Sequence, residues 1–331
     1  MAEACCRVYL FTYKRNNLLS RAVKSLTGQT FRDWVCEVHN DDPQDIFPQQ
    51  YINSLNDPRF TVHNHTQNMG AVASFNLAFA GCSEKYATML EDDNWWEPDF
   101  LKEAVNLMNG NPTLKVAWSN MHLWQENAND TWTDTGNTTW PVKEGTTYFS
   151  WPAPKQIMGA LHSNGAMIYR VDLARNYIIP GNALFNAVEL IRERSFEHPL
   201  CLINKPLANF AITKATHRSN DPYPWIANQI MLVASFVSTA KQKKEAFKLG
   251  LQYSRKQKPS PVPNLFLANL LILKDKNLYA FFSFKDWFII LKWLLSNGNK
   301  LSKLRTYLFE QKNVYAFLLE NTRKRQNESS L

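Results

Sequence analysis

The N-terminal part of the chain alternates between short apolar runs and stretches with helical spacing. Runs typical of strands lie at 8–12, 34–38, 60–62 and 87–90. Between the first two runs, apolar residues fall every three or four positions across 18–26, which predicts an amphipathic helix. Strands that alternate with helices are typical of an α/β fold with an open sheet, in which ligands bind at the carboxyl ends of the strands.

Three adjacent carboxylates follow the fourth predicted strand, at Glu91, Asp92 and Asp93. They repel one another, so a fold keeps them together only where water or a cation screens their charge. At the end of a buried strand they suit a hard divalent cation, Mg²⁺ or Mn²⁺, that also holds a phosphate. An acidic triplet alone is more typical of a solvated turn. Its meaning therefore depends on the surrounding motifs.

Five motifs occur in order along this part of the chain. They are Thr12-Tyr13-Lys14-Arg15, Ser25-Leu26-Thr27-Gly28-Gln29-Thr30, Val38-His39-Asn40-Asp41-Asp42-Pro43, Asn68-Met69-Gly70 with Asn76, and Leu90-Glu91-Asp92-Asp93-Asn94-Trp95-Trp96-Glu97-Pro98. Together they resemble the nucleotide-sugar-binding half of family 2 inverting glycosyltransferases, over residues 8–101. That family has the GT-A fold, a Rossmann-like open mixed sheet flanked by helices. Glu91 stands where the family usually has Asp, and Asn94 replaces a final Asp.

The resemblance implies a nucleotide-sugar site at one edge of the sheet. It implies that Glu91 and Asp93 hold the cation against both phosphates, and that Asp92 lies beside the ribose. Asp41 is expected to accept a hydrogen bond from a uracil-type base, although an aspartate after a strand also often caps a turn. The other residues expected to bind the nucleotide sugar are Thr12, Tyr13, Arg15, Asn68, Gly70, Asn76 and Gly165.

The general base expected from the resemblance is an acidic residue at the head of a helix. Aligning Arg192 with the family's helical arginine places Asn186 at that position, and an amide cannot take a proton. Glu189 lies one turn further on nearly the same face, so we expect it to be the base, with Asp172 as a more distant candidate. An ordinary surface glutamate would look the same in the sequence.

A further metal ligand is implied at His217, because Thr216-His217-Arg218-Ser219 resembles an H-x-S motif of the family. A neutral imidazole is compatible with Mn²⁺ and less so with Mg²⁺. The expected cofactor is therefore Mn²⁺ or Mg²⁺.

The C-terminal part of the chain is strongly basic. From Lys241 onward there are 18 Lys+Arg against 6 Asp+Glu, a net charge of +12, whereas the preceding residues carry −4. This part is also rich in large apolar residues, but charges interrupt every run well before it could span a bilayer. We expect 256–331 to be a helical region that lies on an anionic membrane, with Trp287, Phe288 and Trp293 inserted. A subdomain packed on the core or a homodimer contact would show the same pattern.

The predicted domains are a catalytic domain at 1–255, with a nucleotide-sugar-binding half at 1–101 and an acceptor half at 102–255, followed by the basic region at 256–331. No apolar signal-peptide segment precedes the first strand, so we expect a cytoplasmic protein at the inner face of the cell membrane. The basic region has no recognisable nucleic-acid module, and its aromatic residues lie among aliphatic ones, so no nucleic-acid partner is expected.

The sequence thus predicts a metal-dependent inverting glycosyltransferase. Its expected donor is a UDP-sugar, and its expected acceptor is a hydroxyl of a glycan or lipid-linked glycan in bacterial polysaccharide or lipopolysaccharide synthesis. One alternative is a nucleotidyltransferase acting on a sugar phosphate, but the glycine-rich triphosphate loop of such enzymes is missing from Lys14-Arg15-Asn16-Asn17. The other is a degenerate sugar-nucleotide-binding protein, which Asn186 leaves open.

Overall fold

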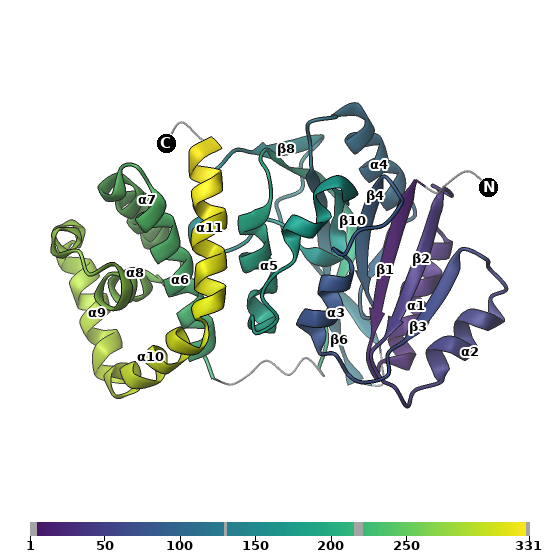
Figure 1. The fold of residues 1–331 in the computed structure, drawn as a ribbon, viewed down its shortest axis with the longest axis horizontal. Coiled ribbons are helices and arrows are strands. Elements are labelled where there is room, and N and C mark those ends of the chain that lie inside the picture. The colour runs from purple at the N-terminus through teal and green to yellow at the C-terminus, as the bar shows by residue number, and fades with distance from the viewer. Residues whose placement is uncertain (1–4, 129–130, 215–220, 329–331) are drawn as a thin grey trace. The chain divides into compact units, whose positions relative to one another are not determined.

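The computed structural model describes residues 5–128, 131–214 and 221–328. They form two compact units. The sheet unit comprises Met1–Phe149, His162–Ile178 and Phe196–His217, and the helical unit comprises Ser150–Leu161, Ile179–Ser195 and Arg218–Leu331. The ribbon is drawn in Figure 1.

The sheet unit is built on one mixed sheet, which agrees with the predicted fold class. Its strands are β1 (Cys6–Thr12), β2 (Trp34–Asn40), β3 (Phe60–Asn64), β4 (Tyr86–Glu91), β5 (Trp95–Trp96), β6 (Val116–Glu126), β7 (Trp132–Thr138), β8 (Thr146–Phe149), β9 (Met167–Arg170) and β10 (Leu200–Ile212). Among the described residues the strand order is β3-β2-β1-β4-β9-β6-β10-β5, with β7 on β6 and β8 on β10. The first four strands in this order are parallel, whereas β9 runs antiparallel to both of its neighbours.

The central strands β1 and β4 are apolar and almost wholly buried, as expected of parallel strands that are covered on both faces. Val8 and Leu10 of β1 and Leu90 of β4 are fully buried in a core that the helices of this unit help to form. The helices are α1 (Asn16–Thr27), α2 (Phe47–Ser54), α3 (Ala71–Leu77) and α4 (Phe100–Gly110). The buried side chain of Gln29 donates to the carbonyl of Glu97 at 2.8 Å and accepts from the amide N–H of Leu101 at 2.9 Å, which fixes the segment after β4.

The parallel pairing brings three strand ends to one edge of the sheet. Thr12 lies opposite Asn40 in the β1–β2 pair, and Phe11 lies opposite Glu91 in the β1–β4 pair. The polar residues that follow β1, β2 and β4 therefore start from neighbouring positions.

The helical unit surrounds one apolar helix, α6 (Tyr223–Thr239), which packs against several other helices of this unit. The remaining helices are α5 (Val188–Arg192), α7 (Lys243–Lys256), α8 (Val262–Ala268), α9 (Phe284–Asn297), α10 (Leu301–Glu310) and α11 (Lys312–Glu328). Buried Glu193 accepts from the amide N–H of Leu161 at 2.8 Å, and buried Arg194 donates to the carbonyl of Leu232 at 3.3 Å. These bonds tie the three segments of the unit together.

The division at 255/256 that we predicted does not coincide with the border between the compact units. α7 lies before that division and α8 after it, yet both pack in the same core as α6. In the part of the chain that the structure describes, no helix is both long and apolar enough to cross a membrane.

Candidate functional site

The carboxylates after β4 are held against the end of β1. The amide N–H of Asp92 donates to the carbonyl of Phe11 at 3.1 Å, and the amide N–H of Tyr13 donates to the Asp92 carboxylate at 3.2 Å. Asp92 is buried, as is Thr12 beside it. The structure therefore brings together Thr12, Tyr13 and the acidic triplet, as we predicted from the strand ends.

Arg15 is the counter-charge of two of these carboxylates. It forms an ion pair with Asp93 and lies 3.6 Å from an oxygen of Asp92. Burial raises the pKa of the Asp92 carboxyl to about 7, Asp93 adds to this rise, and Arg15 opposes it. Burial also raises the pKa of Asp93, again against the effect of Arg15. One guanidinium thus offsets only part of the cost of burying two negative charges, and the site favours additional positive charge.

Glu91 forms a hydrogen bond with the side chain of Asn94, and Gly165 packs directly over this pair. A Cβ at Gly165 would lie 3.1 Å from the Glu91 carboxylate and 3.0 Å from the Asn94 amide, which is tighter than ordinary contacts. The indole N–H of Trp96 donates to the Gly165 carbonyl at 2.7 Å. The backbone at Gly165 thus approaches the Glu91–Asn94 pair closely, whereas its contact with the nucleotide sugar stays a prediction.

Asp41 holds the loop that starts α3. Its carboxylate accepts from the amide N–H groups of Met69 at 2.8 Å and Gly70 at 3.1 Å, and it lies 2.9 Å from the imidazole of His65. Asn68 also accepts from Gly70, and Gly70 has a φ of 77°, which suits glycine. Asn76 follows within α3. The predicted group Asp41, Asn68 and Gly70 is thus assembled, while the contact of Asp41 with a base stays a prediction.

Arg21 of α1 is a site residue that we did not predict. Its guanidinium lies 3.8 Å from the ring of Trp95 and 4.2 Å from that of Trp132, and it donates to the Asp93 carbonyl at 2.8 Å. Burial lowers its pKa to about 10, and Asp93 opposes this. The stacked rings therefore hold a cation against the backbone of the acidic triplet.

The described residues contain no group of three or more His, Cys, Asp or Glu side chains arranged around a metal position. Two buried carboxylates with raised pKa values, only partly neutralised by Arg15, nevertheless suit a hard cation. The predicted ligand His217 lies outside the described residues.

The two candidate bases lie in different units. Glu189 lies on α5 of the helical unit, where it and Glu193 oppose the lowering of the Lys155 pKa by burial. Its role as a base stays a prediction. Asp172 lies in the sheet unit, beyond the β9 residue that pairs with the first residue of β4, so it is at the opposite end of β4 from Glu91. There it forms an ion pair with Lys115 at 3.0 Å. This position does not fit a base for chemistry at the acidic triplet, and the prediction for Asp172 is corrected.

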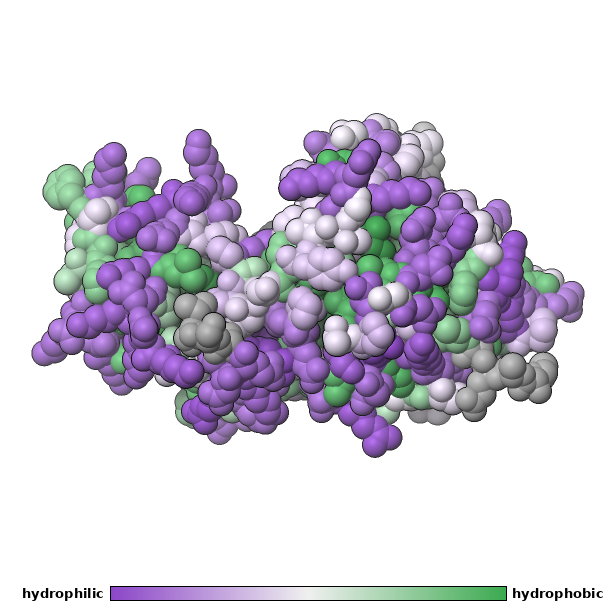
Figure 2. Space-filling view, turned by 90° about the horizontal axis from the view of Figure 1, so that it is seen from above, coloured by the Kyte–Doolittle hydropathy of each residue, from purple (hydrophilic) through white to green (hydrophobic). Residues whose placement is uncertain are grey.

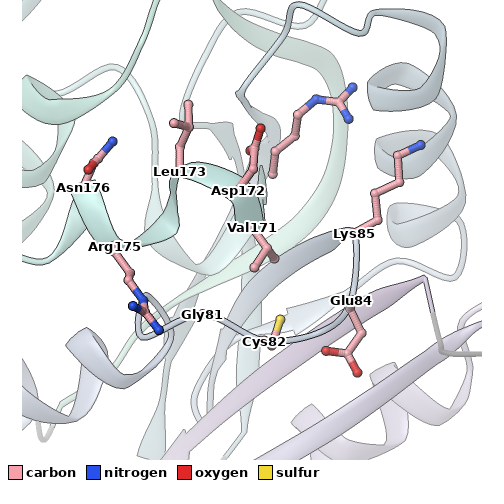
Figure 3. Close-up of a pocket in the computed structure, with 10 residues that line it drawn as sticks. Gly81, Cys82, Glu84, Lys85, Val171, Asp172, Leu173, Arg175 and Asn176 are labelled. Carbon is pink, nitrogen blue, oxygen red and sulfur yellow. The ribbon is translucent and has the colours of Figure 1, made fainter.

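Asp172 also lines a cavity of about 710 Å³ at that opposite edge. Figure 3 shows it there with Lys85 and Arg175. This cavity is therefore separate from the carboxyl ends of β1 and β4.

Comparison with known proteins relates part of this chain to a family. Residues 8–171 match the model of glycosyl transferase family 2. A relative named as a colanic acid biosynthesis glycosyl transferase, WcaA of Escherichia coli (strain K12), is 35% identical over 95 residues, which are 28% of this chain and 34% of the relative. The match thus covers about a third of that relative's length.

Two crystal structures of S. aureus TarS 1–349 have similar folds. The complex with UDP is 14% identical with a TM-score of 0.59, and the complex with UDP-GlcNAc is 15% identical with a TM-score of 0.59. Each comparison covers 98% of this chain and 90% of the other. These likenesses confirm the predicted fold class. The match over residues 8–171 and the relative from Escherichia coli both relate this chain to glycosyltransferases of family 2 type.

Proposed function

We propose that this protein transfers a sugar from a UDP-sugar to a hydroxyl of a glycan or lipid-linked glycan during synthesis of a bacterial surface polysaccharide. The main support is the pair of buried Asp92 and partly buried Asp93, held with Arg15 at the carboxyl ends of β1 and β4. The relative named for colanic acid biosynthesis supports the pathway, and the TarS complexes with UDP and UDP-GlcNAc support the donor.

The binding of the donor changes the partners of the carboxylates. Arg15 leaves Asp93 and contacts the diphosphate, where its planar guanidinium suits phosphate oxygens. Glu91 and Asp93 would hold Mn²⁺ or Mg²⁺, which would neutralise charge on the leaving diphosphate. Asp41 keeps the Met69–Gly70 loop in place, because its carboxylate accepts from both amides. Asp92 stays close to Tyr13, on the side of the ribose.

Transfer then needs a base for the acceptor hydroxyl, and we assign this role to Glu189. As the proton moves to Glu189, the acceptor oxygen forms a bond to the anomeric carbon. The bond from that carbon to the diphosphate breaks on the opposite side, so the configuration inverts. Arg21 acts as a positioning residue, because it fixes the Asp93 backbone from the side of Trp95 and Trp132.

The test is a panel of nucleotide sugars with Mn²⁺, in which release of nucleoside diphosphate is measured with and without glycan acceptors. We expect slow hydrolysis of one UDP-sugar and faster release with the right acceptor. Pyrophosphate release from a nucleoside triphosphate and a sugar phosphate would favour a nucleotidyltransferase instead. Donor binding without any turnover would favour a degenerate binding protein.

The proposal places the enzyme on the cytoplasmic face of the membrane, where a lipid-linked acceptor would be presented. The net charge of +12 from Lys241 onward supports an anionic surface as its partner. A homodimer through the same helical region is the competing arrangement.

A further inference from the structure

The helix α9 carries a row of large apolar side chains that its own unit does not cover. Phe284, Phe288, Leu291 and Leu295 are 88%, 66%, 55% and 89% exposed. Their spacing of four, three and four residues aligns them along one narrow face of the helix. Four neighbouring apolar side chains with this exposure are unusual on a surface that faces only water.

The opposite side of α9 is firmly anchored, so the exposed row is not a sign of a loosely packed helix. Ser283 and Asp286 form a capping box at its start, and buried Asp286 is also an ion-pair partner of Arg255. Ile290 is fully buried, and the ring of Trp287 lies 5.6 Å from that of Phe282.

This packing corrects which residues of the region face outward. Trp287 and Trp293, which we predicted to insert into a membrane, are partly buried against the core of the helical unit. Phe288 is exposed as predicted. The exposed row of α9 thus consists of phenylalanine and leucine.

The exposed charged side chains of α9 are all positive. Lys285 and Lys292 are exposed, and at helical spacing both lie on the same flank of the exposed row. Asp286 is the only acidic residue of the helix, and Arg255 neutralises it. An apolar row with basic residues along one side is typical of a helix that lies in the interface of an anionic bilayer.

We propose that α9 docks the enzyme on an anionic lipid surface, with Phe284, Phe288, Leu291 and Leu295 inserted and Lys285 and Lys292 at the headgroups. The inference rests on the proposed function, because a lipid-linked acceptor requires the enzyme at the membrane. A second copy of the chain fits less well, because two regions that each carry a net charge of +12 would then face one another. Figure 2 shows hydrophobic residues at the left-hand end of the face it views, the side on which α9 lies in Figure 1.

The test uses the full-length protein and sedimentation with vesicles of phosphatidylcholine alone or mixed with phosphatidylglycerol. We expect binding to the anionic vesicles, part of which survives high salt because apolar insertion is not screened. Phe288→Ser with Leu295→Ser should weaken this salt-resistant binding by about tenfold or more. Lys285→Glu with Lys292→Glu should remove the preference for anionic vesicles. Ile46→Ser in the sheet unit is the matched control, because Ile46 is as exposed as Phe288, at 66%.

Hydrolysis of the donor in solution separates this inference from the proposed function. The Phe288→Ser, Leu295→Ser variant should hydrolyse the donor at the wild-type rate, which also shows that it is folded. If it binds anionic vesicles as well as the wild type does, the inference is overturned. It is equally overturned if the wild type does not bind vesicles and forms a dimer that this variant loses. If the wild-type protein hydrolyses no nucleotide-sugar donor, this result counts against the proposed function and leaves the membrane inference standing.

Discussion

At the scale of single residues, the site sets the burial of the Asp92 and Asp93 carboxylates against the positive charge of Arg15. Arg15 pairs with Asp93 where the proposal places a cation, so cation and arginine compete for the same oxygen atoms. The raised pKa of Asp92 and Asp93 shows that burial outweighs this compensation. Binding of a cation and a diphosphate together would satisfy both the carboxylates and Arg15.

Asp93→Asn tests this balance because it keeps the volume of the side chain and removes its charge. Turnover should fall by at least about a hundredfold in a nucleoside diphosphate release assay. EDTA should abolish the wild-type activity, and Mn²⁺ should restore it. Asp172→Asn is the control, since it removes a carboxylate at the opposite end of β4 and should leave turnover unchanged. Full activity in EDTA would exclude a metal role for the acidic triplet.

Glu189→Gln tests the proposed base. Loss of a general base should lower turnover by about two to four orders of magnitude, while binding of the UDP-sugar, followed by calorimetry, stays the same. A variant that keeps wild-type turnover would show that another group takes the proton.

Gly165→Ala tests the close packing over Glu91. The added Cβ would press on the Glu91–Asn94 pair, so the half-saturating concentration of Mn²⁺ should rise about tenfold. Gly110→Ala is the control, because its Cβ would meet no atom within 4 Å. An unchanged Mn²⁺ titration would remove Glu91 from the proposed ligands.

Much of this site was predictable because parallel strands bring their carboxyl ends to one edge. Asp41 and the acidic triplet lie close to the ends of predicted strands, and the resemblance to family 2 glycosyltransferases added Thr12 and the expected roles. Arg21 was not predictable, because an arginine on an amphipathic helix looks like a solvent-facing residue. Its partner Trp132 lies in a stretch whose pattern does not distinguish strand from loop, since β7 is a largely exposed strand of polar residues paired with β6.

At the scale of elements, α9 shows that the presence of a helix is easier to predict from sequence than which of its faces is buried. Apolar residues occupy both sides of this helix, so its sequence does not distinguish the anchored face from the exposed one. The capping box and the Arg255–Asp286 pair fix the orientation in the structure. The Arg255–Asp286 pair joins residues 31 positions apart and has no periodic signal in the sequence.

The same pair predicts a pH dependence of stability. The hydrogen bond and charge of Arg255, with donors from Ser283, hold the pKa of Asp286 below its ordinary value although burial raises it. A carboxyl with a depressed folded pKa stabilises the protein above its unfolded pKa, near 4, and this contribution is lost as pH falls through the folded pKa. Asp286→Asn should therefore lower the free energy of unfolding by about 1–2 kcal/mol at pH 7 and by much less at pH 3. Urea unfolding at both pH values checks this. If Asp286→Asn lowered the free energy of unfolding equally at both pH values, the charge of Asp286 would contribute nothing to stability.

At the scale of the whole molecule, the helical unit is needed to cover α6. Truncation after Pro263 would remove most of α8 together with α9, α10 and α11, and would uncover apolar residues of α6 such as Ile230 and Phe236. We therefore expect the truncated protein to aggregate on expression rather than to remain a monomeric donor hydrolase. Light scattering and donor hydrolysis measure this. A monodisperse, active fragment would contradict it and would support the predicted division at 255/256.

The order of the segments along the chain has a consequence for recombination between relatives. The chain passes from one unit to the other five times, because the segments Ser150–Leu161 and Ile179–Ser195 of the helical unit lie between segments of the sheet unit. A single crossover cannot exchange one unit intact. For example, Glu193 from one parent would then have to accept its hydrogen bond from Leu161 of the other parent. Chimeras that acquire a foreign helical unit must therefore replace all three of its segments together.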